Sequence, residues 1–142
     1  MNVSRSSLRA IDEYPYRAAI AQGVRLVMVS WAIYPSLDAS LPAGLSSVIV
    51  KGELRDRLGF HGVTVTDALE AGTLQPYGTI AQRSVLAAKA GMDLILCSQG
   101  NVGEGEQARA ALQNGYLSGS LNKAAFAAAV RRVTALRLSL GD

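Results

Sequence analysis

A single aspartate follows a short β-branched run and is the residue best placed to do chemistry. Asp67 closes residues 62–67 (GVTVTD), whose valines and threonines are typical of a β-strand. Enzymes built on parallel strands deliver their functional groups from the carboxyl ends of those strands. An aspartate at such a position can also cap a turn or the next helix. Position alone therefore leaves a catalytic role and a capping role open for Asp67.

The elements around Asp67 alternate between strands and helices. We expect strands over residues 24–29, 63–66 and 94–97, and helices over residues 15–21, 46–58, 79–90, 106–113 and 123–140. Gly23, Gly59 and Gly91 are natural stops for the first three helices. Alternation of this kind predicts an α/β fold with a parallel sheet.

Four stretches of the chain occur in an order that one known family shares. They are residues 15–20 (PYRAAI), 27–38 (VMVSWAIYPSLD), 58–70 (LGFHGVTVTDALE) and 90–97 (AGMDLILC). Together they resemble glycoside hydrolase family 3, most closely its bacterial β-N-acetylglucosaminidase branch. By this resemblance, the third stretch is the nucleophile strand and the first is the helix that follows the acid/base loop.

The resemblance implies only part of a barrel. It is strong over about the first two thirds of the chain, and 142 residues are too few for eight strand-helix units, which need roughly 250. We therefore expect a partial TIM barrel, with about three parallel strands and flanking helices. Residues 1–142 would form the C-terminal half of a family 3 type barrel, with a helical tail from about residue 103.

The resemblance also implies retaining hydrolysis of O-glycosyl bonds, with terminal β-N-acetylglucosaminides as substrates and Asp67 as nucleophile. In that mechanism a second group, about 5 Å from the nucleophile, protonates the leaving oxygen. In this branch the second group is a histidine on a loop before the helix that begins here at about Ser7, and the chain starts too late to contain it. The alternative is a catalytically inactive remnant or assembly module of the same fold.

Three further residues are candidates for binding the substrate: Ser30, Trp31 and Glu70. Trp31 stands where the family often has a histidine, and it either stacks on a sugar ring or fills the core. Glu70 either reaches the pocket of Asp67 or makes a loop contact or salt bridge. The only histidine, His61, would lie roughly 20 Å from Asp67 at the other end of the strand, so we interpret it as a structural loop residue.

Composition excludes several other classes of protein. The chain is 49% hydrophobic and 18% charged with a net charge of +3, and it has no basic stripe, which indicates a soluble globular domain that binds no nucleic acid. Its apolar runs are shorter than the roughly 18 residues that span a bilayer. No signal-peptide core follows Met1, so we expect a cytoplasmic location if Met1 is the true start. Cys97, the only cysteine, is expected to be a buried inert thiol, and we expect no metal and no cofactor.

A sheet of three parallel strands would leave exposed edges and apolar faces. Besides a carbohydrate substrate, we therefore expect a protein partner, which is either a second copy of the chain in a homo-oligomer or a complementing N-terminal half-barrel.

Overall fold

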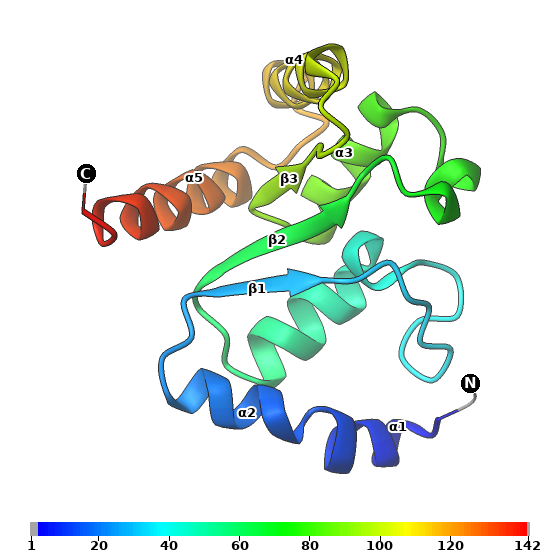
Figure 1. Cartoon of the computed structure of the whole chain (residues 1–142), viewed down its shortest axis with the longest axis vertical. Helices are drawn as coiled ribbons and strands as arrows, with labels where there is room; N and C mark the ends of the chain where they lie inside the picture. Colours follow the sequence, from blue (N-terminus) through cyan, green and yellow to red (C-terminus); the bar gives the residue numbers. More distant parts are fainter. Residues whose placement is uncertain (1–2, 142) are drawn as a thin grey trace.

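Three parallel strands form the centre of the protein, whose computed structural model describes residues 3–141. The strands β1 (Leu26–Val29), β2 (Val63–Ala68) and β3 (Leu94–Leu96) lie in that order in one sheet (Figure 1). Both neighbouring pairs are parallel. The α/β fold with three parallel strands, predicted from the alternation of elements, is confirmed.

Helical segments connect the strands. In chain order they are α1 (Arg5–Ser7), η1 (Leu8–Asp12) and α2 (Tyr14–Ala21) before β1; η2 (Ala43–Leu45) and η3 (Val48–Arg57) before β2; η4 (Gly72–Tyr77) and α3 (Ile80–Ala90) before β3; and α4 (Val102–Ser118) and α5 (Lys123–Leu138) after it. Thr79 and Gln82 form a capping box at the start of α3, and Gly91 ends that helix at a φ of 109°. None of the described helices is long and apolar enough to cross a membrane.

Some predicted bounds are wrong. The helix expected over 106–113 is α4, which runs from Val102 to Ser118 and takes in part of the glycine-rich stretch after β3. Asn101 caps it, because its side chain accepts the N–H of Gly103 at 3.0 Å. The helix before β2 has wide turns, and the N–H of Leu58 donates to the carbonyl of Glu53 five residues earlier.

The two faces of β1 differ in how they are covered. Val29 belongs to the main core cluster, together with Leu54 of η3 and Ala87 of α3. Alternate residues of a strand point to opposite faces, and Leu26 and Met28 on the other face are 41% and 53% exposed. That apolar face of β1 is therefore open among the described residues.

A buried ion cluster joins the amino ends of β2 and β3 to the last helix. The side chain of Asp93, just before β3, has no exposed surface and accepts hydrogen bonds from Arg55 at 2.7 Å and Arg132 at 2.6 Å. It also accepts the N–H of Thr64 at 3.0 Å. Figure 1 shows α5, which carries Arg132, on the side where the strands begin. Because this end lies opposite Asp67, we assign the cluster to stability.

Candidate active site

Asp67 lies near the carboxyl end of the central strand with its side chain exposed. One of its oxygens, Oδ1, accepts the N–H of Ala68 at 2.7 Å. The residue before Asp67 pairs with the last residue of β1, so Ser30, just beyond β1, is its neighbour on the adjacent strand. Asp67 caps no helix nearby, because η4 and α3 begin after Ala71 and Thr79.

The pairing between β2 and β3 is irregular around Asp67. Val65 pairs with Leu94 and Ala68 pairs with Leu96, so β2 advances three residues while β3 advances two. Within this irregularity, the hydroxyl of Thr66 accepts the N–H of Leu96 at 2.9 Å. An extra residue of this kind changes the direction of a side chain and is common beside active sites. The irregularity thus sets the direction in which the Asp67 side chain leaves the strand.

The residues after Asp67 are held by partners from several elements. The indole N–H of Trp31 donates to the carbonyl of Ala68 at 2.9 Å, and the N–H of Leu69 donates to the carbonyl of Leu96 at 2.9 Å. The guanidinium of Arg83, on α3, donates to the carbonyl of Leu69 at 2.8 Å. The end of β2 is therefore fixed from the segment after β1, from β3 and from α3.

Sequence reasoning missed Arg83. The residue is only 8% exposed, and it also donates to the carbonyl of Gly78 at 2.7 Å. A signal was present, because Arg83 lies three residues after Ile80 and four before Ala87, on the apolar face of a helix. A charged residue at a core position needs buried partners, and here they are main-chain carbonyls.

The structure favours one of the two roles left open for Trp31. Its side chain is 6% exposed and lies in the main core cluster, against the backbone of Gly44. A ring with so little exposed surface has no free face for a sugar, so the expectation of sugar stacking is not supported. Its contacts indicate a role in packing and in holding Ala68.

Glu70 also makes a structural contact. Its Oε1 accepts the N–H of Ser98 at 2.8 Å and that of Gln99 at 3.4 Å, so it ties the segment after β2 to the loop after β3. Its Oε2 is buried and has no hydrogen-bond partner in the described part of the chain. Neither oxygen is presented to an open site, which favours the loop contact over direct substrate binding.

Cys97 and His61 show no sign of a catalytic role. Cys97 is half-buried and not fully buried as expected. This partial burial raises the pKa of its thiol, and the nearby carboxylates of Glu70 and Glu104 raise it further. The thiol is therefore neutral at ordinary pH, which favours an inert residue over a nucleophile. His61 lies before β2, away from Asp67 at the far end of the strand. Within residues 3–141, no group of three or more His, Cys, Asp and Glu side chains is arranged to hold a metal ion.

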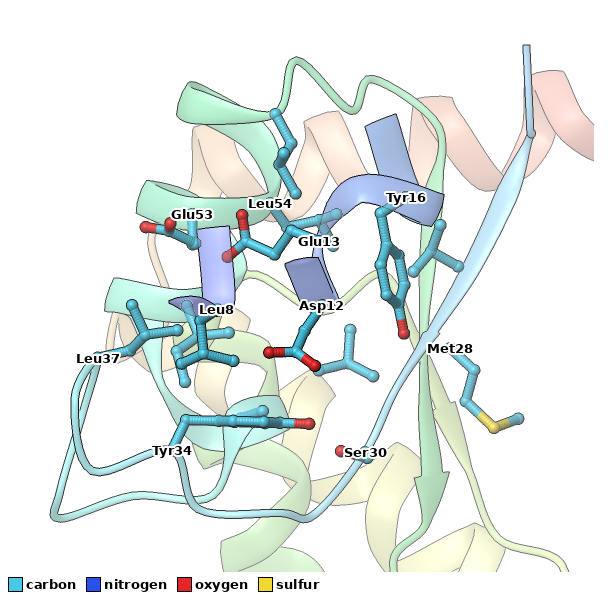
Figure 2. A pocket seen from close by; sticks show the side chains of 15 residues that line it. Leu8, Asp12, Glu13, Tyr16, Met28, Ser30, Tyr34, Leu37, Glu53 and Leu54 are labelled. Carbon is cyan, nitrogen blue, oxygen red and sulfur yellow. The ribbon is translucent and has the colours of Figure 1, made fainter. Parts of the chain in front are cut away.

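A pocket of about 170 Å³ lies between η1 and β1. Figure 2 shows the polar ends of Asp12, Tyr16 and Ser30 turned toward it, while Met28 points away. The described residues of β2 do not line this pocket. Ser30 therefore lines this pocket and is also the neighbour of Asp67 on the adjacent strand.

Comparison with known proteins identifies the family of this chain. Residues 1–136 match the family model described as the glycosyl hydrolase family 3 N terminal domain. The chain belongs to glycoside hydrolase family 3. It is 46% identical over 140 residues to an uncharacterized secreted glycosyl hydrolase of Arthroderma benhamiae, a match that covers 99% of this chain and 40% of the relative. It is 39% identical over 85 residues to a beta-hexosaminidase of Thioalkalivibrio sulfidiphilus, covering 60% of this chain and 24% of the relative.

Two solved enzyme structures share the fold of this chain. A family 3 β-N-acetylglucosaminidase from Paenibacillus superposes with a TM-score of 0.91 at 35% identity, covering 96% of this chain and 26% of that one. A β-N-acetylhexosaminidase from Beutenbergia cavernae gives a TM-score of 0.78 at 36% identity, covering 85% of this chain and 36% of that one. The chain thus spans two fifths or less of the length of these four relatives.

Family 3 membership confirms the resemblance on which the sequence interpretation rested. The Arthroderma relative is described as secreted, so it does not confirm the cytoplasmic location expected from the sequence.

Proposed function

We propose that the chain carries the nucleophile of a retaining glycoside hydrolase and that this nucleophile is Asp67. The observation that carries the proposal is an exposed carboxylate at the irregular carboxyl end of the central strand. Parallel-strand enzymes use this end for chemistry. The hydrogen bond from Ala68 occupies Oδ1, which leaves Oδ2 as the attacking oxygen.

The proposed reaction has two displacement steps. In the first, Oδ2 of ionised Asp67 bonds to the anomeric carbon, and the bond to the leaving oxygen breaks with its electron pair while an acid/base group protonates that oxygen. In the second, the same group removes a proton from water, whose oxygen attacks the anomeric carbon. The bond to Asp67 then breaks, which returns the carboxylate and releases the sugar.

We propose that the acid/base group comes from a polypeptide segment other than residues 3–141. The one histidine lies at the amino end of β2. The oxygens of Glu70 are engaged or buried, as described above. Proton transfer needs a group within about 3 Å of the leaving oxygen, and neither residue is placed to provide one.

Terminal β-N-acetylglucosaminides are the proposed substrates. The support comes from the names of the relatives, a β-N-acetylglucosaminidase and beta-hexosaminidases. We assign Ser30 a hydrogen bond to the bound sugar, because its side chain is exposed and neighbours Asp67 across the strands.

A catalytically inactive assembly module of the same fold is the second candidate. It is favoured by the open face of β1, where Leu26 and Met28 are exposed, since such a face needs a partner. In that case the chain would keep Asp67 but would not hydrolyse a glycoside.

Covalent labelling separates the two candidates. The purified chain would be incubated with a fluorinated N-acetylglucosaminyl donor that has an activated leaving group, and digested for mass spectrometry. We expect one glycosyl unit on the peptide that contains Asp67, no labelling of Asp67→Asn, and normal labelling of the exposed-site control Asp56→Asn. A label on another residue contradicts the assignment, and the absence of any label favours the inactive module.

A further inference from the structure

We propose that Trp31 is a positioning residue that sets the direction of the Asp67 carboxylate, while Arg83 holds the segment that follows. This proposal rests on the proposed role of Asp67 as nucleophile. Neither residue touches the carboxylate. Both act through the main chain that follows it, by hydrogen bonds to consecutive carbonyl groups.

The peptide between Ala68 and Leu69 is held on both sides. Its carbonyl oxygen accepts the indole N–H of Trp31 at 2.9 Å, and its N–H donates to Leu96 of β3 at 2.9 Å. Regular pairing between β1 and β2 ends at the pair of Val29 and Thr66. The indole therefore supplies, from the β1 side, a hydrogen bond that the strand itself no longer makes.

Arg83 closes the segment that follows. Its Nη1 donates to the carbonyl of Leu69 at 2.8 Å and its Nε donates to the carbonyl of Gly78 at 2.7 Å. These two carbonyls come before and after η4, so a single planar guanidinium ties together the residues that flank this segment. Hydrogen bonds from a charged donor are stronger than neutral ones, and the fork of an arginine reaches two acceptors that a lysine cannot hold equally well.

The fixed peptide controls the carboxylate through Ala68. The N–H of Ala68 donates to Oδ1 of Asp67 at 2.7 Å. The orientation of this N–H depends on rotation about the backbone bonds of Ala68. Holding the next peptide on both sides limits that rotation. A misplacement of about 1 Å at a reacting group can cost on the order of a hundredfold in rate, so this control matters for attack on the anomeric carbon.

Gly44 makes room for the indole. A Cβ atom at this position would lie 2.5 Å from Cζ3 of Trp31, which is closer than any real contact. The N–H of Gly44 also donates to the carbonyl of Ser30 at 3.2 Å, which fixes the loop against the end of β1. Gly44→Ala should therefore displace the indole of Trp31 without removing its N–H group from the protein.

The test compares Trp31→Phe and Gly44→Ala with Val50→Ala in the full chain. Trp31→Phe keeps an aromatic ring and removes the donor. Val50 is fully buried in the same core cluster, but its side chain takes no part in the hydrogen bonds to residues 67–70. Val50→Ala therefore controls for a general loss of stability. Two readouts are used, amide NMR and the rate constant for labelling Asp67 at saturating donor.

The NMR readout does not depend on activity. We expect the downfield amide proton of Ala68 to move upfield, and exchange of the Leu69 amide to accelerate by about tenfold or more, in Trp31→Phe and Gly44→Ala but not in Val50→Ala. Unchanged Ala68 and Leu69 amides in both test variants overturn the proposal, whether or not the parent chain is labelled.

The labelling readout then tests the link to chemistry. If the parent is labelled, the maximal labelling rate should fall by about tenfold or more in both test variants, with little change in the donor concentration for half-maximal rate. Altered amides with an unchanged maximal rate would show a merely structural contact and overturn the positioning role. A parent without any label would contradict the proposed function, and the amides would still decide whether Trp31 sets the geometry at Asp67.

Discussion

The indole nitrogen of Trp31 lies 2.9 Å from the carbonyl oxygen of Ala68 and donates a hydrogen bond to it. The loop after β1 is thereby fixed to the residue that follows Asp67. An aromatic side chain that is 6% exposed is in this way part of the core and also a neighbour of the candidate nucleophile. Packing of the core and geometry at Asp67 are therefore not independent.

Replacing Asp67 should affect chemistry and not folding. We expect Asp67→Asn to change the free energy of unfolding by less than about 0.5 kcal/mol, because the side chain is exposed and packs against little. Urea denaturation followed by circular dichroism measures this. If Asp67 instead has a structural capping role, the same substitution should cost about 0.5 to 2 kcal/mol.

The choice of substrate should decide whether any turnover is seen. Because we propose that the acid/base group lies outside residues 3–141, we expect very slow release of ordinary aryl N-acetylglucosaminides by the chain alone. A 2,4-dinitrophenyl glycoside needs little protonation of its leaving group, so it should still give trace release, measured by absorbance. Rapid hydrolysis of an unactivated disaccharide by the pure chain would rule out a missing acid/base.

The ion cluster at the amino ends of the strands should contribute to stability. Arg132→Met removes one of two guanidiniums from Asp93, whose side chain has no exposed surface. We expect a loss of about 1 to 3 kcal/mol, since a buried charge loses part of its compensation. Arg131→Met on the same helix, whose side chain is exposed, is the matched control and should change stability by less than about 0.5 kcal/mol. Equal effects of the two substitutions in thermal unfolding would contradict this role for the cluster.

The open face of β1 should drive association. We expect light scattering at micromolar concentration to show a dimer or a larger species, because exposed apolar strand surface seeks cover. Met28→Lys, at a side chain that is 53% exposed, should shift the chain toward monomer, whereas Ile11→Lys, on η1 outside the sheet, should not. A stable monomer of the parent chain at that concentration would refute the expectation.

Local sequence predicted the elements that local chemistry determines. The β-branched run before Asp67 is a strand, and Gly91 ends a helix, because both depend on residues close in the chain. The environment of Trp31 could not be predicted in this way. It depends on Gly44, thirteen residues later, whose missing side chain leaves space for the ring. The sequence alone therefore left open whether Trp31 stacks on a sugar ring or fills the core.

Two other differences have similar causes. Gly103 and Gly105 lower helix propensity, so the helix was expected to begin only at residue 106, but the cap at Asn101 and packing of α4 on α3 outweigh them. Arg83 was overlooked because a charged residue is normally assigned to the surface. Its partners are the carbonyls of Leu69 and Gly78, which only the tertiary structure brings within reach.

The partners of Asp93 also set an order of events during synthesis. Arg132 lies 39 residues after Asp93, so the ribosome synthesises Asp93 well before Arg132, the second arginine that binds its carboxylate. At about 5 to 20 residues per second, that delay is roughly 2 to 8 s. During it, Arg55 alone must compensate the charge at the start of β3. The nascent sheet therefore reaches its final stability only when α5 has emerged, and a ribosome stalled before Arg132 would present an unfinished domain to chaperones and proteases.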